Sequence, residues 1–225
     1  MTYLIAEFGS SPAPDWDFAT WCAAARQSGA DSVKIQLWRA DHFPEEERAA
    51  KRPLEFPRGQ LYRFIAAARS VGLRAGCSVF DREAVTLAAH EGCDFLKLAA
   101  REQDNYELRG QVLDTGKRVY RSISALNDDS QLLFEVTLFA IQRYPTPLFS
   151  ALWQLWRASQ FFKVNRMQWG WSSHTRGIFD CILAARLGAG VVEKHFALSS
   201  GDVEAGHSLL PDQFAEMARR INDER

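Results

Sequence analysis

Short runs of apolar and β-branched residues alternate with longer stretches rich in Ala, Leu and Arg from one end of the chain to the other. This alternation is typical of parallel strands that are joined by crossover helices. Strand-like segments lie at residues 3–9, 32–38, 74–80, 95–100, 118–124, 134–141, 167–173 and 191–198. Helices are expected at about 15–28, 58–71, 82–91, 103–115, 129–133, 148–162, 177–187 and 211–222. Eight such units predict one α/β domain over residues 1–225, a (β/α)8 TIM barrel.

Glycines support the positions of the helix ends. One glycine follows each of five helical stretches, where a left-handed residue would end the helix before the next strand. They are Gly29, Gly72, Gly92, Gly116 and Gly188.

Two connections are longer than a minimal unit needs, and both follow strands. Residues 39–57 contain three prolines and a charged run at 45–48, and residues 199–211 are rich in glycine. In a barrel both would emerge at the carboxyl ends of the strands, where long loops often cover a functional site. For residues 45–48 a solvated charged insertion is the favoured interpretation.

Composition and charge exclude several kinds of partner. The chain has 225 residues, of which 47% are apolar, so it can bury a large core. Its net charge is −1 with scattered cations, which argues against binding to nucleic acid or to an anionic membrane. No apolar stretch reaches the roughly 18 residues of a membrane span, and the start lacks a basic leader, so we expect a cytoplasmic protein.

The cysteines lie within apolar patterns and form no CxxC pair. They are Cys22, Cys77, Cys93 and Cys181. This distribution favours buried reduced thiols over a disulfide framework or a zinc cluster.

Polar residues gather where the predicted strands end. The alternation of residues 33–36 places Lys34 and Gln36 on one face, which must be the interior or rim of the barrel. Lys97 repeats this arrangement in the fourth strand. A lysine inside a barrel is costly unless it meets an anion. With Ser78, the two lysines predict a cradle for a small molecule that carries phosphate and carboxylate.

A second interpretation of the same lysines is structural. Lys34 and Lys97 would then form buried ion pairs with Glu7, Glu102 or Glu193. The residue pattern alone leaves both interpretations open.

Two histidines, His174 and His195, lie where successive predicted strands end and are 21 positions apart, the length of one strand–helix unit. In a barrel both imidazoles would lie at the same end, where barrel enzymes keep their active sites. Two converging imidazoles near an acidic residue predict a site for a borderline divalent metal. His207, in the loop beyond the last strand, is either a third group of this site or a plain loop residue.

With these residues placed, the chain resembles the sialic acid synthase family. The resemblance covers nearly the whole chain, through seven segments that follow in the family's order. They are IAEFG at 5–9, GADSVKIQ at 29–36, SVFD at 78–81, FLKL at 95–98, RYPTP at 143–147, SSHTRG at 172–177 and GAGVVEKHF at 188–196.

The resemblance implies a metal-dependent condensation of phosphoenolpyruvate with an aldose similar to N-acetylmannosamine, with release of phosphate. It places a divalent metal on His174 and His195, with Mn²⁺ favoured over Mg²⁺, Co²⁺ or Zn²⁺. The substrate-binding residues it implies are Lys34, Gln36, Ser78, Lys97, Tyr144 and Ser172. Gln142 stands where the family has Asn, and Arg101 and Arg143 are additions that could replace lost anion contacts, so these three are also expected to bind substrate. The candidate catalytic residues are Glu102, Glu7 and Lys194. Small-molecule substrates are the expected partners, and a homo-oligomer is left open.

Departures from the family pattern fall mainly in the acceptor half. The family's Ser-Gly-Glu after the fourth strand reads Ala100-Arg101-Glu102 here, and its Ser-Asp-His reads Ser172-Ser173-His174. The family's separate C-terminal antifreeze-like domain has no counterpart in these residues, so loops 39–57 and 199–211 are expected to cover the acceptor. Two alternatives follow: a synthase with an altered, phosphorylated acceptor, and a degenerate barrel that binds a sugar or a partner without catalysis.

Overall fold

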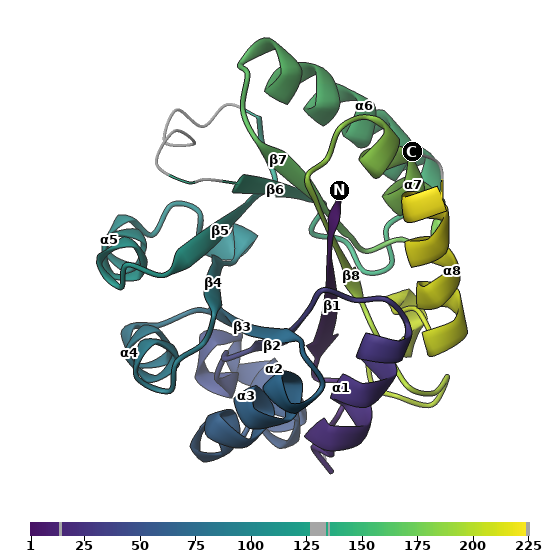
Figure 1. The fold of residues 1–225 in the computed structure, drawn as a ribbon. Helices are drawn as coiled ribbons and strands as arrows, with labels where there is room; N and C mark the ends of the chain where they lie inside the picture. The colour runs from purple at the N-terminus through teal and green to yellow at the C-terminus, as the bar shows by residue number, and fades with distance from the viewer. Residues whose placement is uncertain (14, 127–133, 135, 224–225) are drawn as a thin grey trace.

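Eight parallel strands close into a barrel in chain order, and β1 pairs with both β2 and β8. The computed structural model describes residues 1–13, 15–126, 134 and 136–223. The strands are β1 (Tyr3–Gly9), β2 (Ser32–Gln36), β3 (Arg74–Val79), β4 (Phe95–Leu98), β5 (Arg118–Ile123), β6 (Val136–Ala140), β7 (Trp169–Ser173) and β8 (Val191–His195). Helices surround the strands (Figure 1), which confirms the predicted (β/α)8 barrel.

The helices around the barrel also match the predicted order. They are α1 (Phe18–Gln27), α3 (Leu61–Ser70), α4 (Arg82–His90), α5 (Tyr106–Asp114), α6 (Leu148–Val164), α7 (Phe179–Arg186) and α8 (Pro211–Asp223). The helix predicted at 129–133 lies outside the described residues. All five glycines predicted to end helices have positive φ angles, between 64° and 95°. All four cysteines are buried and unpaired, as expected.

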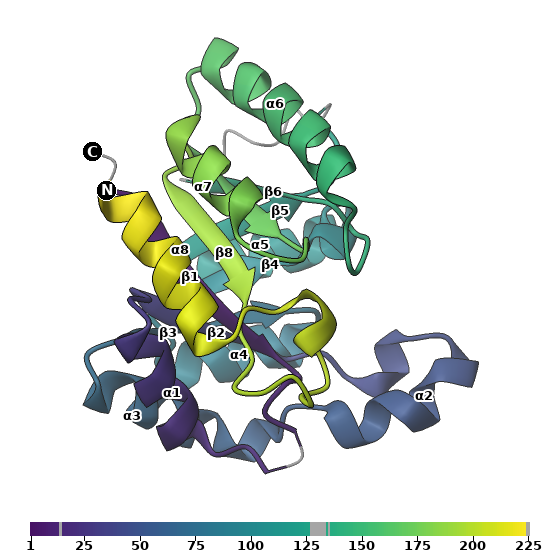
Figure 2. The ribbon, with the colours of Figure 1, turned by 90° about the vertical axis from the view of Figure 1, so that its right-hand side faces the viewer.

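The segment 39–57 contains one short helix that the sequence did not predict, α2 (Glu45–Lys51). None of its residues is buried, which agrees with the expected solvated insertion. Short 3-10 turns, η1 (Ala40–His42) and η2 (Arg52–Leu54), flank it, and Figure 2 shows α2 projecting away from the barrel at the lower right. Three glutamates in the first turn of α2 favour its helical form because they face the positive end of the helix dipole.

Alternation along the strands separates two apolar layers. Leu4, Ala6 and Phe8 of β1 belong to the large cluster between strands and helices. Ile5 belongs to a separate small cluster with Phe95, Tyr120, Val136, Leu138 and Val191. Because side chains alternate across a strand, this small cluster fills the barrel interior. Residues two positions further along the same strands therefore line the interior at the carboxyl ends.

A local irregularity in β1 helps to shape that end of the barrel. The register with β2 shifts between Glu7 and Gly9, and the Glu7 carboxylate accepts a hydrogen bond of 2.8 Å from the backbone N–H of Gly9. Gly9 has a φ of 54°, a conformation that glycine adopts at low cost.

No helix among the described residues is long and apolar enough to cross a membrane.

The interior packing generates a stability prediction at Gly76. A Cβ atom at this position would collide with the ring of Phe95 inside the barrel. We therefore expect Gly76→Ala to lower the free energy of unfolding by about 1–3 kcal/mol, the usual cost of overpacking a core. Urea unfolding would measure it. Adding Phe95→Leu should recover part of the loss, whereas purely additive effects of the two substitutions would contradict the proposed collision.

Candidate active site

A cavity of about 520 Å³ opens at the carboxyl ends of the strands. Side chains from the strand ends line its inner part, and both long connections contribute to its mouth. Of the residues predicted for the site, eleven line this cavity. They are Glu7, Lys34, Gln36, Ser78, Lys97, Arg101, Gln142, Tyr144, Ser172, His174 and His195.

Three residues predicted for the site do not line the cavity. Lys194 is fully buried but bonds to Ser173 and Thr175 on the other face of the sheet, because neighbouring residues of β8 point to opposite sides. Glu102 lies in η4 (Ala100–Glu102), where its carboxylate contacts Arg101 and Asn105. Arg143 is exposed beyond the end of β6. Lys194 and Glu102 therefore lie outside the lining of the cavity, and their catalytic roles stay predictions.

A layer of four charged side chains forms the floor of the cavity. Lys34 forms an ion pair with Glu7, and its ammonium nitrogen lies 3.5 Å from a carboxylate oxygen of Glu193. Lys97 pairs with the other oxygen of Glu193. All four residues are at most 7% exposed, so few water molecules can compensate their charges. The ion-pair interpretation of the lysines thus describes this state, with Glu7 and Glu193 rather than Glu102 as partners.

Burial and charge act against each other in this layer. Burial lowers the pKa of Lys34 to about 7, although Glu193 favours its charged form. Burial raises the pKa of Glu193, but Lys34 and Lys97 outweigh this effect and hold it below its ordinary range. Two ammonium groups therefore share two carboxylates, and an additional anion would stabilise the charged form of Lys34.

Serine hydroxyls surround the charged layer. Lys34 donates a hydrogen bond of 2.6 Å to Ser78, and Ser172 donates one of 2.8 Å to Glu193. Ser122 lines the cavity with a buried hydroxyl that has no hydrogen-bond partner within the described part of the chain. A buried hydroxyl without a partner is costly, so Ser122 offers a donor to a bound anion.

Three imidazoles meet beside the charged layer. The ring centroids of His195 and His207 are 4.5 Å apart, and those of His174 and His195 are 5.4 Å apart. The ring of Tyr144 packs against His174 at a tilt of 45°, with the two ring centroids 4.2 Å apart. His207 lies in η6 (Ala205–His207), so the structure favours a place in the site for it over a plain loop role.

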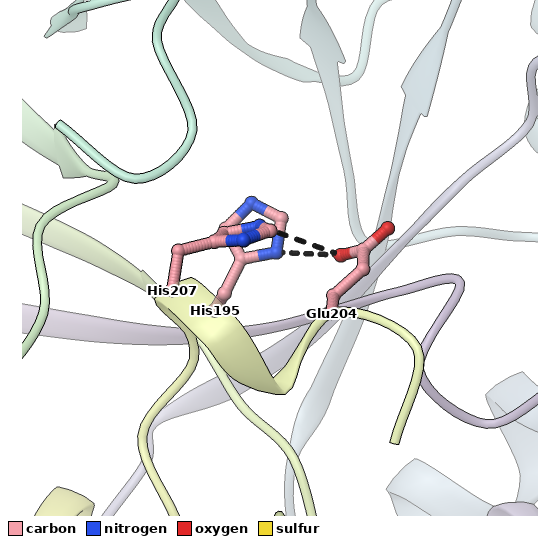
Figure 3. A group of neighbouring side chains, drawn as sticks. All are labelled: His195, Glu204 and His207. Atoms are coloured by element: carbon pink, nitrogen blue, oxygen red, sulfur yellow. Dashed lines mark hydrogen bonds and ion pairs between the residues drawn. The ribbon is translucent and has the colours of Figure 1, made fainter. Parts of the chain in front are cut away.

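Glu204 completes this group, as Figure 3 shows. Its Oε2 atom lies 2.8 Å from Nδ1 of His195 and 4.0 Å from Nε2 of His207. One ligand atom from each of His195, Glu204 and His207 can be chosen so that all three lie within 4.8 Å of one another. Glu204 also accepts a hydrogen bond from the backbone of Ser10, which ties the loop after β8 to the loop after β1.

The donor set fits a divalent metal. Nδ1 of His174 lies 2.7 Å from the carbonyl oxygen of Ile141, which can accept but not donate, so the lone pair of His174 lies on Nε2. Burial lowers the pKa of His207 to about 4 and holds the pKa of His174 well below its ordinary value. Both imidazoles are therefore neutral near pH 7, the form that binds metal.

Sequence reasoning missed Glu204 as a site residue. It lies in a loop without periodicity, and only its spacing of three residues from His207 could have marked it. The sequence pattern suggested Glu193 as an ion-pair partner but not as a site residue. It lies two positions before His195 on β8, so both side chains point to the same face.

Comparison with known proteins identifies the chain. A model of the NeuB family matches residues 21–225. The chain belongs to the NeuB family. It is 26% identical to the human N-acetylneuraminate-9-phosphate synthase, over 97% of this chain and 69% of that protein. It is 27% identical to the pseudaminic acid synthase of Helicobacter pylori, over 87% of this chain and 66% of that protein.

A solved structure shares the fold of this NeuB-family chain. It is an N-acetylneuraminic acid synthetase from Leptospira borgpetersenii, crystallised with citrate, and it superposes with a TM-score of 0.89 at 22% identity. The match covers 99% of this chain and 83% of that one. The resemblance to sialic acid synthases and the prediction of a sugar acid synthase are confirmed at the level of the family.

The charged layer of this NeuB-family chain generates a second prediction. Lys34→Met leaves Glu7 without its cation and weakens the compensation of Glu193, so the free energy of unfolding should fall by about 3–5 kcal/mol at pH 7. Lys163→Met, on the exposed side of α6, is the control and should change it by less than about 0.5 kcal/mol. Chemical denaturation measures both. Equal stabilities of the two variants would show that the layer is held by solvent rather than by Lys34.

Proposed function

We propose that this chain condenses phosphoenolpyruvate with an aldose to form a 2-keto-3-deoxy sugar acid, with release of phosphate. One observation carries the proposal: buried lysines and serines for an anion lie in the same cavity as a group of imidazoles suited to a metal. Family membership supports the reaction class, because relatives are named as synthases of sialic and pseudaminic acid.

The inner part of the cavity suits the donor substrate. Phosphoenolpyruvate carries a phosphate and a carboxylate, and Lys34 and Lys97 supply ammonium groups at the cavity floor. Ser78, Ser122 and Ser172 add hydroxyl donors around them. Charge-assisted hydrogen bonds of this kind are roughly twice as strong as neutral ones, which favours an anion over water at this floor.

A divalent metal would be held by His174 and His195, with Glu204 and His207 as further donors. Nitrogen donors of imidazole together with one carboxylate suit Mn²⁺ or Zn²⁺ better than Ca²⁺. When bound, such an ion acts as a Lewis acid that polarises the aldehyde of the acceptor. Glu204 orients His195 through the hydrogen bond to Nδ1, so it also sets the direction of the Nε2 lone pair.

The acceptor would lie above the donor, against Gln36, Gln142 and Tyr144, which line the outer cavity. The enol carbon of phosphoenolpyruvate forms a bond to the aldehyde carbon, and the aldehyde oxygen takes up a proton. Water then adds to the oxocarbenium carbon that this bond formation leaves, and the carbon–oxygen bond to phosphate breaks as the ketone forms. One proton of the water passes to a base, and the other leaves with phosphate. Glu7 lines the cavity floor and would be the base that accepts the first of these protons.

The test is phosphate release from phosphoenolpyruvate in the presence of N-acetylmannosamine and related aldoses. Removal of metal by a chelator should abolish the release, and Mn²⁺ should restore it. His174→Ala and His195→Ala should each lower bound metal and activity together, since a ligand set is broken. Metal analysis of the purified variants measures the first effect.

A matched substitution separates ligation from general damage to the fold. His90→Ala removes an exposed imidazole at the end of α4 and should change neither metal content nor phosphate release. Unchanged metal content in His174→Ala and His195→Ala would refute the metal site. Metal binding without turnover of any acceptor would favour the degenerate, sugar-binding barrel.

A further inference from the structure

Two cations lie at the mouth of the cavity, apart from the lysines of its floor. The ammonium of Lys51, at the end of α2, lies 4.9 Å from the ring centroid of Phe43. The guanidinium of Arg101, in η4, lies 4.8 Å from the same centroid and 4.5 Å from that of Phe80. All four residues line the cavity. Cation–π contact with the two rings limits the movement of the guanidinium, which carries five N–H donors.

The carboxylates near this mouth are largely engaged elsewhere. Glu102 contacts Arg101 only through Nε, at 3.4 Å, and does not line the cavity. Asp81 pairs with Arg58 at 2.6 Å. Lys51 forms no ion pair with a carboxylate in the part of the chain that the structure describes. The mouth therefore carries surplus positive charge on a fixed support.

The position of these cations relates them to the far end of a substrate. η4 follows β4, which lies four strands away from β8 in the closed ring, so Arg101 lies across the mouth from His195. α2 follows β2, and its Lys51 contacts the same Phe43 ring as Arg101. An aldose whose aldehyde lies at the histidines would extend across the mouth towards Arg101. The opposite end of the sugar would then meet the two cations.

We propose that Lys51 and Arg101 bind an anionic group, a phosphate or a carboxylate, at the end of the acceptor remote from its aldehyde. The proposal rests on the proposed condensation, and it names the acceptor as an anionic aldose. Arginine suits this role because its planar edge makes paired hydrogen bonds to phosphate or carboxylate oxygens. The insertion at 39–57 would then form part of the anion site, because it supplies both Lys51 and the ring of Phe43 that contacts Arg101.

The experiment compares three acceptors: N-acetylmannosamine, its 6-phosphate and its 6-carboxylate. Consumption of phosphoenolpyruvate gives kcat/KM for each acceptor. In the wild type an anionic acceptor should exceed the neutral sugar by about 10-fold or more, the value of one charge-assisted hydrogen bond. Arg101→Ala and Lys51→Ala should lower this ratio. Arg52→Ala, an exposed cation of the same insertion paired with Asp41, should leave the ratio unchanged.

The outcomes separate this proposal from the proposed function. A wild-type preference for the neutral sugar, or a ratio that Arg101→Ala does not change, overturns the anionic acceptor and leaves the condensation standing. If no acceptor is turned over, the condensation fails, and calorimetric binding of the 6-phosphate to wild type and Arg101→Ala still tests the mouth. The anionic acceptor with the larger ratio of kcat/KM to that of the neutral sugar identifies the anion as phosphate or carboxylate.

A second inference concerns Lys194, which is fully buried behind the site. Its ammonium donates to the hydroxyl of Ser173, at 3.1 Å, and to the carbonyl oxygen of Thr175. The Thr175 hydroxyl in turn donates to Asp180 at 2.7 Å. Asp180, itself fully buried in α7, also accepts a hydrogen bond of 2.8 Å from the indole of Trp171.

This network contacts the ends of β7 and β8, which carry His174 and His195, on the outer face of the barrel. Ser173 and Thr175 flank His174 in the chain, and the backbone of Lys194 runs directly into His195. One buried ammonium therefore links the end of β7 to the end of β8. Such a link restricts how far the two imidazoles can move apart.

We infer that Lys194 is a positioning residue that, with Thr175 and Asp180, sets the separation of His174 and His195. Partners that orient metal ligands from behind commonly affect metal affinity by about 10–100-fold. Lys194→Met keeps the length of the side chain but removes the link, and Thr175→Val removes the bond to Asp180. Thr175→Ser keeps that bond and serves as the conservative variant.

Titration of Mn²⁺ into the metal-free proteins by calorimetry tests the inference. Lys194→Met and Thr175→Val should bind Mn²⁺ at least about 10-fold more weakly than the wild type. Thr175→Ser should retain most of the wild-type affinity. Val112→Ala, a core variant on α5, controls for lost stability and should bind as the wild type does. Equal affinities in all variants would overturn the positioning role.

A readout without metal keeps this inference separate from the metal site itself. In the wild type, Nδ1 of His174 carries the proton that Ile141 accepts, and nitrogen NMR of the metal-free protein reports this tautomer. Lys194→Met should produce a mixture of tautomers at His174, whereas Val112→Ala should not. An unchanged tautomer in Lys194→Met would refute the role even if the wild type bound no metal.

Discussion

The layer of two lysines and two glutamates inside the barrel is the constraint on which the rest of the site depends. Lys34, Lys97, Glu7 and Glu193 come from four strands, and none of them can be stable in an apolar interior alone. Replacing the four by apolar residues would cost the fold little in principle. Their charges are therefore better explained by a ligand than by stability, since an entering anion can exchange with the carboxylates for the same ammonium groups.

In strand β8, neighbouring residues point to opposite faces of the sheet and therefore have different roles. Glu193 and His195 point into the cavity, where they meet the lysines and Glu204. Lys194, between them, points outwards and bonds to the end of β7. The same three residues thus supply a charge, an imidazole that we propose binds a metal, and a support. A one-residue shift of this strand would exchange all three roles, which ties the register of the barrel to its chemistry.

The sequence predicted the barrel because each strand, helix and terminal glycine carries a local signal. It also placed Lys34, Lys97, His174 and His195 correctly at one end, since strand parity and strand ends suffice for that. It failed where direction depends on tertiary context. Lys194 was expected in the site because the strand end contains many polar residues, and only pairing with β7 shows which face it occupies.

Residues on connections were harder to predict than residues on strands, for a physical reason. The floor of the cavity is built on paired strands whose register is fixed, whereas its mouth is built on turns such as η4 and η6 and on the inserted helix α2. Changes in these connections alter what meets the far end of an acceptor without disturbing the ion layer. This division between floor and mouth suits a family whose members are named for different sugar acids. Two such members are each about one-quarter identical to this chain. A donor cradle held by the barrel can stay constant while each chain supplies its own mouth, and in our proposal Arg101, in contact with Phe43 and Phe80, is that local contribution.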